Sequence, residues 1–450
     1  MKKASAASTS PPRINRRHFL RVTAAASLPW WFTERLRAED APARPRPNDR
    51  PGIALIGCGG MGIADARAAA RFGDVVAVCD VDRNHREAAA RQLTVDGKTP
   101  DPLADFRRVM ERDDVHVIIN GTPDHWHTLI NLAAANAKKD IYAEKPLTHS
   151  IDEGRRIIAA VRKNRVVLQT GTQQRSSHRF RLACELVRNG RIGRLQRVQV
   201  FVPAGLREGP FAAAQKVPPE LNWDFWLGPA PQADYQRERC HGSFRWWYDY
   251  AGGPVTDWGA HHNDIARWAI GQDGPLRVEA RALVEPIPGG YTTPPEFEAT
   301  LHWAGGIEQI VRTTTADAWN GAILQPDGQR NGVRFEGTDG WLWVNRGDLE
   351  ASNEDILFTP LPDNALKLES SRDHMENFFA CVRSRKDPVC PVETGHRSAS
   401  VGHLIVAALR TGKRLEFDPV KEVFTGEHAG AGNAHLARAM RAPYDYEMAG

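Results

Sequence analysis

The 450-residue chain lacks several features that would assign it to a common protein class. It has only six cysteines, none of them in a CxxC pair, and it shows none of the His/Cys spacings typical of zinc sites. No stretch reaches 18 consecutive apolar residues, so we expect no membrane span. A hydrophobic content of 41% with 25% charged residues is instead typical of a globular protein, and the length predicts two domains.

The chain also lacks a charge excess once its first residues are set aside. Residues 1–40 hold eight of the 59 basic residues and three of the 55 acidic ones, which leaves 51 basic and 52 acidic residues. The formal charge of +4 therefore comes from the N-terminus. Nucleic-acid binding usually needs a clustered basic face, so this balance argues against it.

Residues 1–45 form a predicted signal and linker. The run Asn15-Arg16-Arg17-His18-Phe19-Leu20 precedes a weakly apolar stretch over 22–32. A basic segment before a short apolar segment is typical of signal peptides. The arginine pair resembles the twin-arginine export signal, with Asn15 where Ser or Thr is usual. The alternative is an amphipathic helix with two surface arginines. We expect export by the twin-arginine route to the periplasm or another extracytoplasmic space.

Residues 50–174 alternate between short apolar runs and helical patterns. The expected strands are 52–56, 75–79, 115–120, 140–143 and 166–170, with helices between them. Strands separated by helices of this length form a parallel sheet, so the fold class is α/β. The first domain is therefore predicted to be a parallel sheet covered by helices on both faces.

A glycine loop, Gly57-Cys58-Gly59-Gly60-Met61-Gly62, follows the first expected strand and precedes a helix, as the dinucleotide fingerprint requires. The first domain is therefore predicted to be a Rossmann domain that binds a dinucleotide. Gly57 would make the tight turn, Gly59 would admit a pyrophosphate, and Gly62 would let helix and strand pack closely. Asp80 ends the second strand. A carboxylate at this position accepts hydrogen bonds from the ribose hydroxyls of the nucleotide and repels a 2′-phosphate. NAD is therefore favoured over NADP, although Arg83 nearby offers a phosphate contact. The alternative for Asp80 is a turn or helix-capping aspartate.

Three further segments carry a family resemblance. They are Thr122-Pro123-Asp124-His125-Trp126-His127, Glu144-Lys145-Pro146-Leu147, and the run from Gly252 to Asp264 that contains Thr256-Asp257-Trp258-Gly259-Ala260-His261-His262. Together with the glycine loop they resemble the Gfo/Idh/MocA superfamily over about residues 52–415. The resemblance implies a second α/β domain over 175–420 with a large, mostly antiparallel open sheet. Residues 421–450 are predicted to be an irregular tail that wraps a neighbouring subunit.

The resemblance also implies a catalytic group. Carried over by position, it consists of Lys145, Asp257 and His261, and it implies a cis Lys145–Pro146 bond. The residue types suit the chemistry, because hydride loss from an alcohol needs a base, and a histidine titrates in the useful range. A lysine beside the hydroxyl would stabilise the developing oxyanion. Asp257 and His261, four residues apart, would share one helix face.

The candidate residues fall into two sets. Those expected to bind the cofactor are Gly57, Gly59, Gly60, Met61, Gly62, Asp80, Arg83, Thr122, Pro123, His127, Glu144, Lys145 and Gln173. Those expected to bind substrate are Lys145, Arg175, Arg245, Trp246, Tyr248, Asp257, His261 and His262, because aromatic faces stack on sugar rings. We expect no metal, although His125, His127, His241, His261, His262 and Asp264 are candidate ligands.

The function implied by the resemblance is NAD-dependent transfer of hydride to or from a hydroxyl carbon of a sugar or sugar derivative, with tightly bound nicotinamide. The alternative is an NAD-dependent glycoside hydrolase or lyase that oxidises the sugar transiently, eliminates the glycosidic bond and reduces again. Such relatives lack the full Glu-Lys-Pro motif, which is intact here. A third hypothesis is a non-catalytic sugar-sensing module. The expected partners are a small sugar or glycoside and further copies of the chain in a homodimer or homotetramer.

Overall fold

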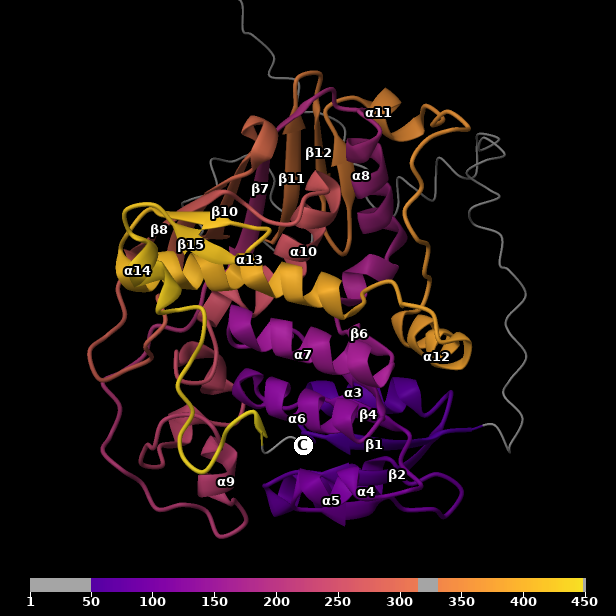
Figure 1. Cartoon of the computed structure of the whole chain (residues 1–450), viewed down its shortest axis with the longest axis vertical. Coiled ribbons are helices and arrows are strands. Elements are labelled where there is room, and N and C mark those ends of the chain that lie inside the picture. The colour runs from indigo at the N-terminus through magenta and orange to yellow at the C-terminus, as the bar shows by residue number, and fades with distance from the viewer. Residues whose placement is uncertain (1–49, 315–330, 448–450) are drawn as a thin grey trace, which may run out of the picture.

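The computed structural model describes residues 50–314 and 331–447. Two sheets form the two ends of the molecule, and helices lie between and around them (Figure 1). The predicted export signal lies outside the described residues. Within those residues, no helix combines the length and apolar character needed to cross a membrane.

The first sheet has six strands, in the order β3-β2-β1-β4-β5-β6, and all of them are parallel. The strands are β1 (Gly52–Ile56), β2 (Asp74–Cys79), β3 (Asp101–Leu103), β4 (Val117–Asn120), β5 (Asp140–Ala143) and β6 (Leu168–Thr170). Every residue of β1, β4, β5 and β6 is buried, as expected for parallel strands with helices on both faces. This is the Rossmann order, so the fold class predicted for the first domain is confirmed.

The helices of this domain are α3 (Gly60–Ala69), α4 (Arg83–Gln92), α5 (Phe106–Met110), α6 (Asp124–Asn136) and α7 (Ile151–Asn164). Helix α4 begins where the Asp82 side chain accepts the backbone N–H groups of Asn84 and His85. This cap satisfies donors that have no partner inside the helix. Strand β3 was not predicted from the sequence, because it is a three-residue edge strand with little apolar signal.

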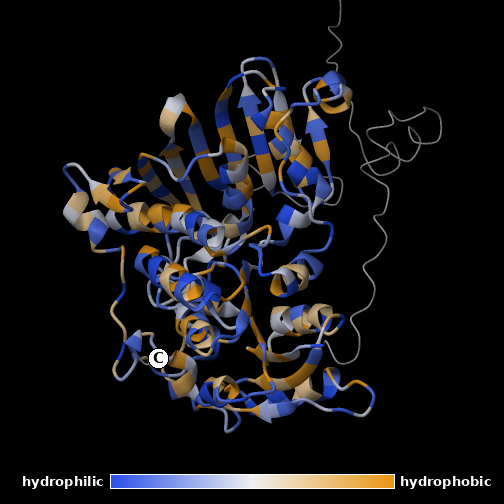
Figure 2. Ribbon diagram, turned by 45° about the vertical axis from the view of Figure 1, so that its right-hand side comes forward, coloured by the Kyte–Doolittle hydropathy of each residue, from blue (hydrophilic) through white to orange (hydrophobic). Residues whose placement is uncertain are grey.

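The second sheet has nine strands, in the order β13-β12-β11-β7-β10-β9-β8-β14-β15. They are β7 (Leu195–Pro203), β8 (Arg277–Val284), β9 (Glu296–His302), β10 (Glu308–Thr314), β11 (Gly332–Gly337), β12 (Trp341–Val344), β13 (Leu349–Ala351), β14 (Leu415–Asp418) and β15 (Val423–Thr425). Only β7 and β10 pair in parallel, so the predicted mostly antiparallel sheet is confirmed. Figure 2 shows the alternation of hydrophilic and hydrophobic residues along these strands.

Three helices cover one face of the second sheet: α8 (His178–Arg188), α10 (Trp258–Ile270) and α13 (Val392–Thr411). Residues on alternate strand positions, such as those of β9, point away from that core. They carry ion pairs between Arg197 and Glu308 and between Arg281 and Glu298. The sheet therefore has an apolar face under the helices and a charged opposite face.

Two segments far along the chain return to the first domain. Helix α12 (His374–Ser384) packs Met375, Phe378 and Phe379 into the core beneath α3. The tail was predicted to be irregular and to wrap a neighbouring subunit, but it contains β15 and α14 (Ala429–Asn433). After α14 it packs on its own chain, since Arg438 pairs with Glu153 at 2.6 Å. The prediction of an irregular segment is corrected accordingly, because its partners lie far away in the sequence, whereas contact with a neighbouring subunit stays a prediction.

Residues 203–256 extend from β7 back toward the first sheet. They contain α9 (Trp223–Leu227) and an aromatic core with Trp223, Trp226 and Tyr250, all of them buried. The backbone of this segment crosses the end of β2, where the Asn222 N–H donates to the Val81 carbonyl at 3.2 Å. We call residues 203–256 the insertion. A further short helix, α11 (Glu354–Phe358), follows β13.

Candidate active site

The glycine loop connects β1 to α3 at the carboxyl edge of the first sheet. Gly57 has a φ of +88°, and a Cβ there would meet the backbone of Gly121 at 2.6 Å. A Cβ on Gly62 would lie 2.1 Å from the Gly57 carbonyl oxygen, so helix and loop are in direct contact. A Cβ on Gly59 or Gly60 would meet no protein atom within 4 Å. The loop is therefore packed on one side and open on the other, as a phosphate cradle at a helix N-terminus requires.

Asp80 ends β2 beside this loop. Its carboxylate accepts the Cys58 N–H at 2.8 Å and the Asp82 N–H at 2.9 Å. Each carboxylate oxygen has a further lone pair available for a ligand hydroxyl. Asp80 therefore both fixes the loop and presents acceptors toward the adjoining cavity, which it lines.

A cavity of about 370 Å³ runs along the carboxyl edge of β1, β2, β4 and β5. It starts at the order reversal between β1 and β4, where doubly wound sheets bind ligands. Of the residues predicted to bind the cofactor, those that line it are Gly57, Gly59, Gly60, Met61, Asp80, Thr122, Pro123, Glu144 and Lys145. The insertion closes the other side with Phe225, Trp226, His241, Gly242, Phe244 and Arg245.

Lys145 and Asp257 meet at the inner end of this cavity. The Lys145 Nζ donates to Asp257 Oδ1 at 2.7 Å, and the two side chains are 12% and 19% exposed. Arg245 Nε donates to the same oxygen at 3.2 Å. Burial opposes ionisation of Asp257, but the charges of Lys145 and Arg245 outweigh it and lower the pKa of Asp257. The Lys145–Pro146 bond is cis, as the resemblance implied.

His261 lies one turn along α10 from Asp257 and is 6% exposed. Its Nδ1 has no hydrogen-bond partner among the described residues. Burial, followed by the positive charges of Lys145 and Arg346, lowers the pKa of His261 well below 6.5. The imidazole is therefore neutral at neutral pH, which is the form that accepts a proton.

A buried pair of carboxyl groups supports the lysine from the other side. Asp65, on α3, faces Glu144, which accepts the Lys145 N–H at 3.2 Å and the Gln173 side-chain amide at 2.9 Å. Burial and the neighbouring Glu144 charge raise the pKa of Asp65 to about 9. At neutral pH Asp65 therefore keeps its proton, and the pair links the glycine-loop helix to the loop that carries Lys145.

Four residues predicted to bind the cofactor do not line the cavity. Arg83 is exposed, and the contact it makes with the insertion is through its backbone N–H. His127 is buried, with its ring nitrogens bonded to the Pro146 and Thr122 carbonyls at 2.6 and 2.8 Å. The Gln173 side-chain amide donates a hydrogen bond to Glu144 at 2.9 Å. Gly62 packs directly against the backbone of Gly57. His127 and Gln173 thus hold the loops that carry lining residues, which corrects their predicted roles.

The predicted substrate residues also divide. Lys145, Arg245 and Asp257 line the cavity. His261 is not among its lining residues and is buried one turn along α10 from Asp257. Arg175 does not, because its guanidinium makes a bidentate pair with Asp264 at 2.7 and 2.8 Å, with side-chain exposures of 5% and 0%. The sequence could not show this pairing, since the partner lies 89 positions away. The predicted substrate contact of Arg175 is therefore corrected to an internal ion pair.

Three further predicted substrate residues lie elsewhere. Tyr248 lines a separate cavity of about 340 Å³ between the insertion, α13 and the tail, beneath the Arg410 guanidinium. The Trp246 ring packs against Gly205. His262 is fully buried, and burial lowers its pKa to about 3. The prediction that these residues contact a ligand in the nucleotide cavity is corrected, because each points into protein or into the second cavity.

Several lining residues stood in neither predicted set, among them Asp124 and His85. Asp124 begins α6, is 7% exposed, and lines both cavities. Burial, opposed by the charges of Arg245 and Lys145, raises its pKa to about 7. His85 lies beside Asp80, with Nδ1 3.7 Å from the Asp80 carboxylate. The sequence signal that could have identified both residues is their position shortly after a strand of a parallel sheet, where such sheets bind ligands.

Two family models match the chain. The model of the oxidoreductase family, NAD-binding Rossmann fold, matches residues 52–172. The model of the oxidoreductase family, C-terminal alpha/beta domain, matches residues 210–446. Both carry the Gfo/Idh/MocA name, and together they span most of the described residues.

Several known proteins are similar to this chain. The scyllo-inositol 2-dehydrogenase (NAD(+)) of Bacillus subtilis (strain 168) is 23% identical over 384 residues, which cover 83% of this chain and 98% of that protein. A glycosyl hydrolase family 109 protein of Solibacter usitatus is 30% identical over 117 residues, 24% of this chain and 27% of that protein. The crystal structure of the Bordetella pertussis WlbA dehydrogenase in complex with NADH and UDP-GlcNAcA superposes with a TM-score of 0.61 at 18% identity, covering 82% and 99% of the two chains.

Proposed function

The chain belongs to the Gfo/Idh/MocA oxidoreductase family, and on that premise we propose that it is an NAD-dependent oxidoreductase acting on a hydroxyl-bearing carbon of a sugar or sugar derivative. The observation that carries this proposal is the Lys145–Asp257 pair, placed 2.7 Å apart in the same cavity as the glycine loop. Inositol dehydrogenases among the similar proteins support the substrate class.

The lining residues fit a dinucleotide. Gly59 and Gly60 leave open space where a side chain would stand, and Asp80 offers carboxylate oxygens to ribose hydroxyls. When bound, NAD supplies the hydride acceptor or donor. The choice of NAD over NADP follows from Asp80, because a carboxylate repels a 2′-phosphate.

Side chains of the protein would stabilise the substrate oxygen and accept its hydroxyl proton. Lys145, held by Asp257, would donate a hydrogen bond to the substrate oxygen and stabilise its negative charge as the C–H bond breaks. His261, neutral because of its burial, would take the hydroxyl proton. Asp257 would orient Lys145 and stay ionised between two cations. Trp226 and Phe225, which line the cavity, would exclude water.

The first experiment identifies the nucleotide and the reaction. Mature protein purified without added cofactor is denatured, and any released nucleotide is identified by mass spectrometry. The native protein is then mixed with a panel of sugars, polyols and glycosides while absorbance of reduced nicotinamide is followed. We expect bound NAD and a stable absorbance rise with one sugar class. If no nucleotide is released and none binds on titration, the proposal fails.

A second function is favoured by the match to the glycosyl hydrolase family 109 protein. In that case the sugar would be oxidised transiently, the glycosidic bond eliminated, and the product reduced again. The same assay separates the two functions, since the second gives glycoside cleavage with no lasting absorbance change. The intact Glu144-Lys145-Pro146 motif favours the oxidoreductase.

We also propose that residues 1–45 direct export by the twin-arginine route, which the Arg16-Arg17 pair supports. Fusion of these residues to a reporter should export it, and replacement of both arginines by lysine should abolish export.

We further propose a homodimer or homotetramer formed through the charged face of the second sheet. Light scattering after size-exclusion chromatography tests the assembly, and a monomeric mass would exclude it.

A further inference from the structure

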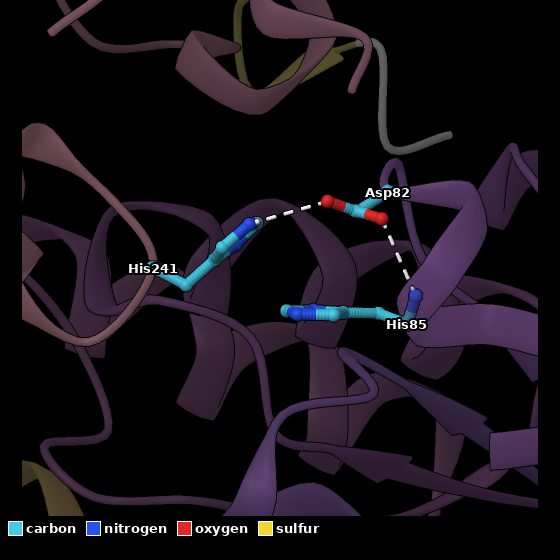
Figure 3. A group of neighbouring side chains, drawn as sticks. All are labelled: Asp82, His85 and His241. Atoms are coloured by element: carbon cyan, nitrogen blue, oxygen red, sulfur yellow. Dashed lines mark hydrogen bonds and ion pairs between the residues drawn. The ribbon is translucent and has the colours of Figure 1, made fainter. Parts of the chain in front are cut away.

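Three side chains with metal-binding atoms meet at the Asp80 end of the nucleotide cavity. Asp82 and His85 come from the start of α4, and His241 comes from the insertion, as Figure 3 shows. The candidate ligand atoms of the three residues all lie within 4.8 Å of one another. Among the described residues, no other group of three or more His, Cys, Asp and Glu side chains brings its ligand atoms this close together.

Asp82 is already held in a ligand-like orientation. Its Oδ1 accepts the Asn84 N–H at 2.8 Å and the His85 N–H at 3.3 Å, which leaves Oδ2 directed at His241. Oδ2 lies 3.2 Å from His241 Nε2. Ligands about 2.0–2.2 Å from a tetrahedral zinc ion stand roughly 3.3–3.5 Å from each other. The two atoms therefore already have nearly the separation that a shared ion would impose.

His85 completes the group. Its ring lies 4.2 Å from the His241 ring, between centroids, and its Nδ1 is 3.7 Å from Asp80 Oδ2. A metal-bound histidine usually directs its other ring nitrogen at a carboxylate, which fixes the ring. With Nδ1 facing Asp80, Nε2 is left for an ion. The side chains of His85 and His241 are 34% and 40% exposed, so an ion can enter from solvent and the rings can adjust.

We propose that Asp82, His85 and His241 bind one divalent transition-metal ion of the zinc type, with water as the fourth ligand. One carboxylate oxygen and two imidazole nitrogens are a donor set suited to zinc. This proposal departs from the expectation drawn from linear spacing, because the third ligand comes from the other domain. The ion joins α4 to the insertion.

The position gives the ion a role in holding nucleotide. His241 is followed directly by Gly242, Phe244 and Arg245, which close the cavity opposite the glycine loop. An ion that fastens His241 to α4 keeps this side of the cavity closed. The ion therefore slows release of nucleotide without entering the chemistry at Lys145.

The rival explanation is a hydrogen bond between His241 and Asp82 that needs no metal. Full-length protein is treated with chelator, and Zn²⁺ alone is titrated by calorimetry. We expect one equivalent per chain. His85→Ala and His241→Ala should each weaken binding by more than the about 10–100-fold that loss of a residue supporting a ligand costs. His241→Gln, which retains a hydrogen-bonding side chain, should weaken it equally. His302→Ala is the matched control, because that surface histidine also lies near a carboxylate, 3.8 Å from Glu279.

A second readout is the rate at which bound NAD is displaced by excess competitor. Zn²⁺ should slow displacement in the wild type and in His302→Ala, but not in His241→Gln. Absence of saturable Zn²⁺ binding, or equal binding by wild type and His241→Gln, overturns the proposal. Because the titration measures heat of Zn²⁺ binding, its result is independent of whether a sugar is oxidised. Circular dichroism confirms that each variant is folded.

Discussion

Replacement of Lys145 by methionine tests the assigned chemistry most directly. Methionine keeps the length and apolar stem of the side chain and removes its charge and three donors. In the folded protein this leaves Asp257 with Arg245 alone, at 3.2 Å. The glycine loop and Asp80 are untouched, so nucleotide binding should be retained.

The expected magnitudes follow from the geometry. Loss of one positioned donor to a developing oxyanion lowers kcat by about 10²–10³-fold. Removing one partner of a fully buried ion pair costs about 3–5 kcal/mol. Here Lys145 and Asp257 are 12% and 19% exposed and Arg245 remains, so we expect about 1–2 kcal/mol. The pKa of Asp257 should also rise.

The assay is single-turnover reduction of bound NAD, followed by absorbance, together with NAD affinity by calorimetry. Arg175→Met is the matched control, since it removes a cation from a more deeply buried pair outside the cavity. It should lower stability by about 3–5 kcal/mol and leave the turnover of folded enzyme unchanged. If Lys145→Met keeps kcat within about tenfold of the wild type, Lys145 is not the oxyanion donor and the reasoning is refuted.

Three other outcomes follow from single positions. Gly62→Ala should lower Tm, because its Cβ would lie 2.1 Å from a carbonyl oxygen, whereas Gly59→Ala should fold normally and bind NAD more weakly; thermal melts and NAD titrations check both. Asp65 has a pKa raised to about 9, against 3.8 when unfolded, so the folded state binds an extra proton between these values and stability falls as pH rises. Asp65→Asn should remove that slope in pH-dependent denaturant melts. Since burial lowers the pKa of His261 well below 6.5, the acid limb of the kcat profile should lie below the usual histidine range; a limb at 6.5 would contradict this.

Local patterns in the sequence were sufficient for the glycine-loop turn and for five of the six strands of the first sheet, all but β3. The glycine loop fixes where β1 ends and α3 begins, and its packing needs are met by backbone within a few residues. The all-apolar strands identify a parallel sheet, because only strands covered on both faces lack a polar side. The motifs around Lys145 and Asp257 indicated which residues meet, although 112 positions separate them.

The tertiary structure decided which polar residues face the cavity. Arg175 and Tyr248 have the chemistry of ligand contacts, but their partners, Asp264 and Arg410, come from distant parts of the chain. A buried guanidinium must find a carboxylate, and Asp264 on α10 provides it. The short edge strands β3, β13 and β15 are stabilised by pairing with neighbours, which a three-residue window cannot reveal.

The sequence by itself thus determined the nucleotide fold and the candidate pair of Lys145 and Asp257, because these depend on local geometry that a motif encodes. Only the tertiary structure decided that the insertion and the tail fold back on the first domain. Tyr444 packs on Trp126, and His241 lies beside Asp82, although each pair is separated by more than a hundred positions. Such contacts depend on burial and complementary charge in three dimensions, which linear spacing does not record.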